Sequence, residues 1–243
     1  MKTVYNFNAL GQLSELSHFK QDEVIDKFVY GYDVMGNKSI ITKQRQGLEA
    51  DNGAYTYSYD PLNRLTEVTK DGNPLRNYSY DNFGNRTKLV ENGVETHYTY
   101  NSLNQLISST DGNSYLYDLR GNLTQIMKNG NVINSYEFNP MNRLEKAINH
   151  ESKLSNVYKY NGLNKRVGNQ IGDLDLNPTK QINDVLDLTR DYHNLLQRNG
   201  DGVTTSYTYD FGLLSADNNS YLLDELGSPM RFEEERFMIL FIA

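Results

Sequence analysis

The segment GYDVMGNKS at residues 31–39 comes close to the pattern of a phosphate-binding loop. In that loop, G-x-x-x-x-G-K-[ST], backbone N–H groups at the start of a helix hold the phosphate. Here Asn37 separates Gly36 from Lys38, and the surrounding pattern predicts a hairpin turn instead of a strand followed by a helix. We therefore interpret residues 31–39 as a structural turn.

A calcium loop is the second candidate site. Asp173, Asp175, Asn177 and Asp184 occur at positions 1, 3, 5 and 12 of the calcium-loop template, and carboxylate and amide oxygens are the ligands that Ca²⁺ takes. However, Pro178 stands where the template requires glycine, and the last ligand is Asp instead of Glu. We interpret the segment as a polar loop between strands, with calcium binding as the alternative.

The remaining candidates do not form a catalytic set. The tripeptide DFG at residues 210–212 matches part of a kinase signature, but no VAIK-like lysine or HRD-like loop accompanies it. The histidines are dispersed, without a G-x-S-x-G or H-E-x-x-H pattern; they are His18, His97, His150 and His193. The sequence thus predicts no catalytic residues, no metal and no cofactor, and we expect a protein that is not an enzyme.

An internal repeat contains most of the 19 tyrosines of the chain. Its pattern is aromatic-x-aromatic-Asp/Asn-x-x-Gly/Asn. Copies begin at Tyr5, Tyr30, Tyr57, Tyr78, Tyr98, Tyr115, Tyr136 and Tyr158, with a degenerate copy at Tyr207. Two aromatic residues at i and i+2 lie on the same face of a strand and on different faces of a helix, so each pair indicates a strand.

A tight turn is predicted after each aromatic pair. The Asp or Asn that follows can accept a hydrogen bond from a backbone N–H group two residues further on. Three residues after it comes Gly or Asn, the residue types that most readily adopt positive φ. These turn residues are Gly11, Gly36, Asn63, Gly84, Asn104, Gly121, Asn142 and Asn164. Turn capping therefore explains the recurring aspartates better than paired acid and base catalysis does.

A second set of turn signals lies between these motifs, for example KDGN at residues 70–73 and KNGN at residues 128–131. Each repeat is then two short antiparallel strands, and the fold class is all-β. The polar alternation leaves little apolar surface for a second layer, so we predict a curved, antiparallel β-sheet ribbon of tandem hairpins. Cross-strand aromatic pairs are expected to hold neighbouring hairpins together.

Composition excludes several classes of function. The net charge of −7 gives no field that would attract nucleic acid or anionic lipid. The chain has no cysteine, and therefore no disulfides or thiolate metal sites. No signal peptide follows Met1 and no apolar run is long enough for a membrane helix. We expect neither a nucleic-acid partner nor a membrane span.

The motifs YGYDVMGNK, YSYDPLNRL, YSYDNFGNR and YLYDLRGNL resemble the YD repeats of Rhs (rearrangement hotspot) proteins. The segment YLLDELGSPMRF is similar to the stretch that leads into the Rhs repeat-associated core, with Asp224, Leu226, Gly227 and Ser228 matching the landmark of that stretch. The resemblance divides the chain into tandem YD repeats at 1–170, degenerate repeats leading to the DELGSP segment at 171–232, and a tail outside the family pattern at 233–243.

The resemblance also implies a function. In the Rhs family the repeats form a spiral shell that encloses a variable C-terminal toxin, and related repeats occur in insecticidal toxin complexes and in teneurin adhesion proteins. The chain is thus expected to be a fragment of a non-catalytic scaffold. Its implied partners are the remainder of a larger Rhs-like protein or its toxin cargo, and the implied route is secreted or cell-surface delivery from bacteria.

Two further expectations follow from the predicted ribbon. Open strand edges favour self-association, in which the apolar segment FMILFIA at residues 237–243 is expected to take part. The alternative to a scaffold is a carbohydrate-binding or cell-surface-binding module that uses exposed tyrosine rows, such as Tyr98 and Tyr100. The two interpretations differ in whether the tyrosine rings pack between repeats or line an open groove.

Overall fold

The computed structural model describes residues 1–189, 194–209, 212–217 and 219–232, and these residues are all-β, as predicted. They form strands and one short 3₁₀-helix, η1 (Glu49–Asp51). The first strands are β1 (Lys2–Phe7), β2 (Leu13–Lys20), β3 (Glu23–Tyr32), β4 (Lys38–Arg45), β5 (Gly53–Tyr59), β6 (Leu65–Lys70), β7 (Asn73–Tyr80), β8 (Arg86–Glu91) and β9 (Val94–Tyr100).

The next strands are β10 (Leu106–Ser109), β11 (Asn113–Tyr117), β12 (Leu123–Lys128), β13 (Asn131–Phe138), β14 (Leu144–Asn149), β15 (Leu154–Tyr160), β16 (Arg166–Gly172), β17 (Pro178–Asp187), β18 (Asn194–Gly200), β19 (Val203–Tyr209) and β20 (Leu213–Ala216). The last two are β21 (Asn219–Leu223) and β22 (Pro229–Phe232). From β1 to β20 each strand pairs antiparallel with the next, and β21 pairs antiparallel with β22.

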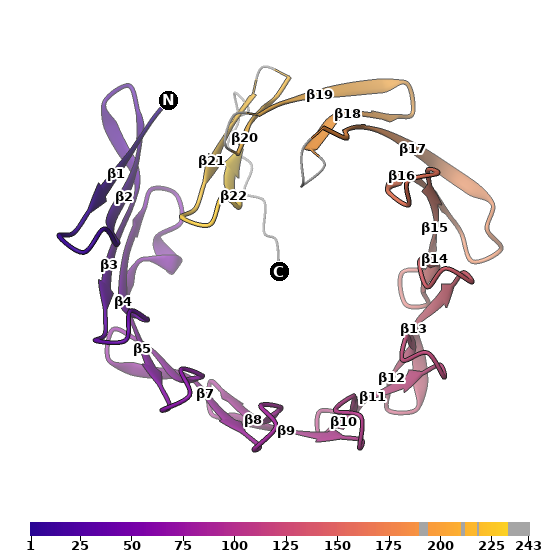
Figure 1. The fold of residues 1–243 in the computed structure, drawn as a ribbon, viewed down its shortest axis with the longest axis horizontal. Coiled ribbons are helices and arrows are strands. Elements are labelled where there is room, and N and C mark those ends of the chain that lie inside the picture. The colour runs from indigo at the N-terminus through magenta and orange to yellow at the C-terminus, as the bar shows by residue number, and fades with distance from the viewer. Residues whose placement is uncertain (190–193, 210–211, 218, 233–243) are drawn as a thin grey trace. The chain divides into compact units, whose positions relative to one another are not determined.

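The chain is divided into two units. The first contains residues 1–97 and the β21–β22 hairpin from residue 220 onward, and the second contains residues 98–219. Within each unit the successive hairpins form a curved ribbon (Figure 1), which confirms the predicted antiparallel ribbon of tandem hairpins. The division of the chain at residue 170 by repeat quality stays a prediction.

The YD motifs form one recurring turn of five residues between paired strands. In the third motif, residues 60–64 separate the paired residues Tyr59 and Leu65. The Asp60 N–H donates to the Arg64 carbonyl, and the Asn63 N–H donates to the Asp60 carbonyl, at 2.9 Å each. Asn63 has a φ of 59°, and the pairing register shifts at Tyr59, so the turn ends in a β-bulge.

The predicted positive φ occurs at every turn position singled out from the sequence. The glycines have φ of 75° at Gly11, 88° at Gly36, 88° at Gly84 and 86° at Gly121. The asparagines have φ of 59° at Asn63, 58° at Asn104, 61° at Asn142 and 68° at Asn164. Between the motifs, tight hairpins such as Asp71–Gly72 and Asn129–Gly130 have positive φ at both central residues, as type I′ turns require.

Neighbouring repeats are joined by tyrosine hydroxyl groups. The second aromatic residue of a motif donates its O–H to the carbonyl that opens the strand after the preceding motif. These hydrogen bonds are Tyr32 to Leu13 (2.8 Å), Tyr59 to Lys38 (2.8 Å), Tyr80 to Leu65 (2.7 Å), Tyr117 to Leu106 (2.9 Å) and Tyr160 to Leu144 (2.7 Å). Phe7 and Phe138 take this position without a hydroxyl group. Each bond fastens a repeat to the one before it.

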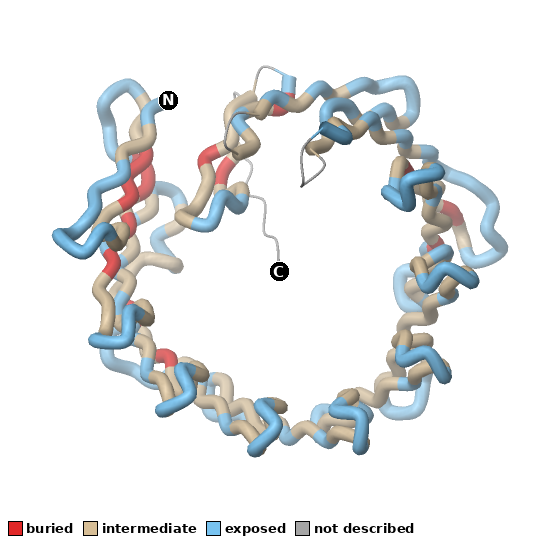
Figure 2. The backbone as a smooth tube through the Cα atoms, in the orientation of Figure 1, coloured by how far each residue is buried: buried red, intermediate tan, exposed pale blue. Residues whose placement is uncertain are grey.

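Most of the fully buried side chains belong to the first unit, and Ser155 is the fully buried one in the second (Figure 2). Leu16, Phe28 and Tyr30 form the core cluster, with Ile41 and Met230 packed against it. Most of the other aromatic residues of the motifs are half-buried, and the residue between them is exposed. Tyr221 and Phe232, whose ring centroids are 4.8 Å apart, form an aromatic pair within the β21–β22 hairpin. Ring pairing between neighbouring hairpins stays a prediction.

We predict that Gly121→Val lowers the free energy of unfolding by about 1–3 kcal/mol, because a β-branched residue at positive φ is strained. Gly121 has a φ of 86°, and a Cβ added there would lie 3.3 Å from Gln105 Nε2. Gly162→Val is the matched control, since Gly162 lies in the equivalent turn with no heavy atom within 4 Å of an added Cβ and no positive φ. Urea unfolding measures both variants. Equal losses for the two would contradict the account of the turn.

Candidate functional site

The recurrent polar residues of the YD motifs form hydrogen bonds inside the turns. In the turn of residues 118–122, the Asp118 Oδ1 atom accepts hydrogen bonds from the N–H groups of Arg120 and Asn122, both at 2.9 Å. The Asn122 side chain donates to Asp118 Oδ2 at 2.9 Å. These bonds, chiefly the one from the Asn122 side chain, lower the pKa of Asp118 to about 2. The carboxylate is therefore an acceptor that caps a turn.

The same Oδ1 bonds recur at the other motifs, with distances between 2.8 and 3.1 Å. The acceptor residues are Asn8, Asp33, Asp60, Asp81, Asn101, Asn139 and Asn161. Asn takes the place of Asp without a change in the bonding pattern, which an acid or base catalyst would not permit. Residues 31–39 contain the turn at Asp33, between β3 and β4, so this segment is a hairpin and lacks the helix of a phosphate loop.

The Rhs landmark is itself a turn of this kind. The N–H groups of Leu226 and Ser228 donate to Asp224 Oδ1 at 2.8 Å each, and Gly227 has a φ of 82°. The ninth motif, by contrast, has its Asp210 and Phe211 outside the described residues. The segment at residues 237–243, for which self-association was predicted, also lies outside them.

Two residues of the calcium-loop template, Asp173 and Asp184, have separate structural roles. Asp173 caps a further turn, in which Asn177 donates its backbone N–H to Oδ1 and its side-chain amide to Oδ2, both at 2.9 Å. Asp184, on β17, forms a bidentate ion pair with Arg198, with contacts of 2.8 and 3.0 Å. Among the described residues, no cluster of three or more His, Asp or Glu side chains is arranged to hold a metal ion.

The turn capped by Asp173 was not predicted from the sequence, because Leu176 occupies the position where Gly or Asn was expected. Leu176 has a φ of 63° and donates its N–H to the Asp173 carbonyl. A usable signal is the Asn four residues after the Asp, since Asn37, Asn85 and Asn122 also donate their side-chain amides to the capping Asp.

A buried ionic cluster joins the β21–β22 hairpin to β3 and β4. Asp26 is completely buried, and Arg231 is 7% exposed. Arg231 Nε lies 2.6 Å from Asp26 Oδ2, and Arg231 Nη2 lies 3.0 Å from Oδ1. Arg45 contacts the same carboxylate from β4, with Nε 3.1 Å from Oδ1, and reaches Asp51 at 3.1 Å. Such a cluster is costly to break, because the remaining partner is left as a buried charge.

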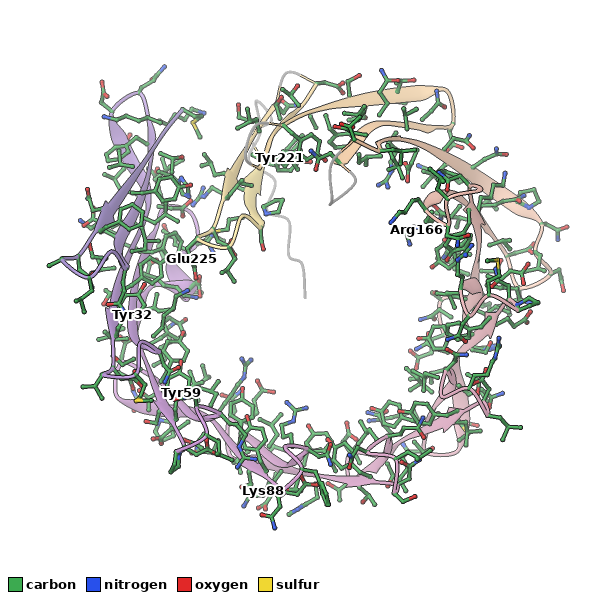
Figure 3. The ribbon with its side chains drawn as sticks, viewed as in Figure 1. Tyr32, Tyr59, Lys88, Arg166, Tyr221 and Glu225 are labelled. Carbon is green, nitrogen blue, oxygen red and sulfur yellow. The ribbon has the colours of Figure 1, made fainter. Side chains whose placement is uncertain are left out.

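A second contact lies at the tip of the same hairpin, where Figure 3 labels Glu225. The Tyr30 hydroxyl donates to Glu225 Oε2 at 2.9 Å, and Lys38 forms an ion pair with Oε1. Burial by itself raises the pKa of Glu225, but the hydrogen bonds from Lys38 and Tyr30 and the Lys38 charge outweigh it, and the pKa is lowered. Glu225 therefore anchors the hairpin in its ionised form.

A cavity of about 420 Å³ lies beside this contact, within the first unit. Its lining combines aromatic and apolar side chains with charged ones: Phe28, Tyr30, Ile41, Lys43, Arg45, Tyr57, Asp224, Glu225 and Met230. Burial raises the pKa of Tyr57 to about 12. Nothing in the sequence indicated this cavity, because its lining comes from β3, β4, β5 and a hairpin far along the chain.

His18 is completely buried on β2, where it faces charged groups from three other strands. Its Nδ1 lies 3.0 Å from the Thr3 hydroxyl on β1. Burial lowers the pKa of His18, with Arg231 and Arg45 acting in the same direction, while the Asp26 charge and a hydrogen bond to the Leu223 backbone oppose it. The folded protein therefore holds His18 neutral.

This environment predicts a specific pH dependence of stability. Because the folded-state pKa of His18 is below the unfolded value of about 6.5, the unfolded state takes up the proton first as the pH falls. The free energy of unfolding should be unchanged by His18 above that pH and should decline below it, by up to about 1.4 kcal/mol per pH unit. Urea unfolding between pH 7.5 and about 5 measures this decline.

His18→Gln is the control for this prediction, because it removes the titrating group and should flatten the decline. The capping aspartates have lowered pKa values, so their contribution to stability is lost only at more acidic pH, and the two effects are separable. A wild-type decline that His18→Gln leaves unchanged would show that another group is responsible.

Comparisons with known proteins agree with this geometry. The family model described as "Teneurin YD-shell" matches residues 1–236. Over 133 residues the chain is 34% identical to the tRNA3(Ser)-specific nuclease WapA of Bacillus spizizenii, covering 51% of this chain and 5% of that protein. It is 32% identical to mouse (Mus musculus) Teneurin-1 over 176 residues, covering 70% of this chain and 6% of that protein.

A solved structure shares the fold. The crystal structure of TcdB2-TccC3 without its hypervariable C-terminal region matches with a TM-score of 0.54 and 13% identity, covering 93% of this chain and 15% of that one. The chain thus spans only a small part of the length of the relatives that it matches.

Within the described part of the chain, no helix has the length and apolar character needed to cross a membrane. The family predicted from the repeated YD motifs is confirmed by the match over residues 1–236. The chain belongs to the teneurin YD-shell family.

Proposed function

We propose that this chain is a non-catalytic part of a YD-repeat shell, which in a longer protein encloses or presents a C-terminal toxin. The observation that carries the proposal is the use of the recurrent polar residues. The capping Asp and Asn oxygens bind backbone N–H groups of their own turns, and the second tyrosines of the motifs donate to neighbouring repeats. Residues that hold the ribbon together in this way are not available for chemistry.

Two carboxylates of low exposure outside the motifs form ion pairs with arginine. Asp26 is held by Arg45 and Arg231, and Asp184 by Arg198. A nucleophile with an adjacent general base, or a pair of carboxylates facing a cleft, would support an enzyme. The cavity has two carboxylates in its lining, but Glu225 is paired with Lys38 and Tyr30, and Asp224 Oδ1 caps its own turn.

The proposed association with a toxin comes from the WapA relatives of this chain. The WapA proteins that match this chain are named as tRNA nucleases, and the matched segment is a small part of their length. We infer that this chain corresponds to the shell of such a protein and not to its nuclease. Its proposed partners are the remainder of a larger Rhs-like protein and the toxin cargo, and its proposed route is secreted or cell-surface delivery from bacteria.

The test has two parts. The chain is expressed alone in the bacterial cytoplasm while growth is followed, and the purified chain is then incubated with bulk tRNA, casein and a soluble glycan. We expect normal growth and no hydrolysis of any of the three substrates, because the recurrent polar residues form the turns and the contacts between repeats. A whole WapA nuclease expressed in parallel is the positive control for tRNA cleavage.

Growth arrest that a single substitution such as Asp184→Asn removes, without a change in the amount of folded protein, would overturn the proposal in favour of an enzyme. Saturable binding to a multivalent glycan surface that is lost in Tyr98→Ala/Tyr100→Ala but retained in Tyr57→Phe would favour a binding module built on tyrosine rows.

A further inference from the structure

Asp224 differs from the other capping aspartates in the use of its second carboxylate oxygen. At Asp33, Asp60, Asp81, Asp118 and Asp173, the side chain four residues later donates to Oδ2: these donors are Asn37, Arg64, Asn85, Asn122 and Asn177. The corresponding residue after Asp224 is Ser228, which donates only its backbone N–H, to Oδ1. Asp224 Oδ2 therefore has no hydrogen-bond partner among the described residues.

Asp224 is also the capping aspartate that lines the cavity of the first unit. A second polar group without a hydrogen-bond partner in the described chain lines the same cavity, the Tyr57 hydroxyl on β5. The corresponding first tyrosine of the preceding motif, Tyr30, donates its hydroxyl to Glu225. Half-buried polar groups without partners are unfavourable, so a ligand that bonds both would be stabilised.

The charges of the lining determine which ligands fit. Lys43 and Arg45 bring two positive charges, and Asp224 and Glu225 bring two negative charges. Lys43 and Arg45 are already paired with Asp51, and Glu225 with Lys38. An anion would lie beside the unpaired Asp224 oxygen, and a cation would lie beside Lys43 and Arg45, so the lining favours a neutral ligand with hydroxyl groups.

The aromatic rings restrict the ligand further. Lys38 lies over the Tyr30 ring at 5.2 Å, and Arg45 lies over the Phe28 ring at 5.7 Å, so cations already occupy a face of each. Among the described residues no cation lies over the ring of Tyr57, which also lines the cavity. A volume of about 420 Å³ is near the lower end of the roughly 300–1,000 Å³ typical of ligand pockets, which suits a ligand of about one ring.

We propose that this cavity binds a single pyranose sugar unit, whose ring lies against Tyr57 and whose hydroxyl groups bond to Asp224 Oδ2 and the Tyr57 hydroxyl. The apolar C–H face of a pyranose suits an aromatic ring, and its hydroxyl groups supply the donor that Asp224 needs and the partner that Tyr57 lacks. The site is separate from the tyrosine rows of the other motifs and from the shell function proposed above.

The test titrates the full chain with methyl β-D-glucopyranoside, methyl β-D-galactopyranoside and methyl α-D-mannopyranoside, followed by calorimetry and ligand-observed NMR. We expect saturable binding of at least one of them with a Kd of about 1–10 mM, as one small neutral ligand would give. Choline chloride is the cationic comparison, and we expect it not to bind.

The decisive variant is Ser228→Asn. It places an asparagine where Asn37, Asn85 and Asn122 occupy the equivalent position, so its amide should bond to Asp224 Oδ2 in place of the ligand. We expect sugar affinity to fall at least about tenfold while the midpoint of urea unfolding stays the same or rises. Loss of binding therefore cannot be attributed to unfolding.

Tyr57→Phe should weaken binding about fivefold to tenfold by removing one hydrogen bond. Its matched control is Tyr136→Phe, at the same motif position but outside the cavity lining, which should bind as the wild type does. The proposal is overturned if none of the three glycosides binds with a Kd below about 50 mM, if Ser228→Asn binds them as tightly as the wild type, or if choline binds in their place.

Discussion

The hydrogen bonds to one side-chain oxygen in each YD turn determine much of the rest of the structure. The Oδ1 atom of the Asp or Asn accepts from two backbone N–H groups that no strand partner could reach, and the turn closes over it. Once the turn is closed, its fourth residue must adopt positive φ and the strand before it must bulge. The bulge lies at the second aromatic residue, whose hydroxyl group reaches the neighbouring repeat. The hydrogen bonds to Oδ1 within one turn thus place the tyrosine that contacts the neighbouring repeat.

The first unit adds an interaction that local repetition does not provide. Asp26 and Arg231 are far apart in the sequence, yet they form a buried ion pair that also involves Arg45. Buried ion pairs contribute little net stability compared with apolar packing, but they penalise any arrangement in which one charge loses its partner. We interpret the cluster as the feature that fixes where the β21–β22 hairpin docks on β3 and β4. The same docking buries His18 and forms the cavity lined by Tyr57 and Asp224.

Much of the fold was predictable from the sequence because its determinants are local. Aromatic residues at i and i+2, the capping Asp or Asn, and Gly or Asn at positive φ all lie within a few residues of one another. The turn at Asp173 was missed because Leu176 replaces the expected residue type, although Asn177 keeps the bonding pattern. The roles of the tyrosine hydroxyl groups, the burial of His18 and the docking of Arg231 depend on the three-dimensional arrangement, and no local pattern indicates them.

The side-chain oxygen of each capping residue contributes more than its charge to holding the repeat together. The most direct measurement compares the free energies of unfolding of Asp81→Asn and Asp81→Ala, with Glu145→Ala as the control on the exposed face of β14. The account predicts that Asp81→Asn stays close to the wild type, because Asn101, Asn139 and Asn161 cap equivalent turns. Asp81→Ala should lose about 1–2 kcal/mol, because two N–H groups lose their acceptor. A loss in Asp81→Asn as large as that in Asp81→Ala, or no loss in Asp81→Ala beyond that of Glu145→Ala, would contradict the account.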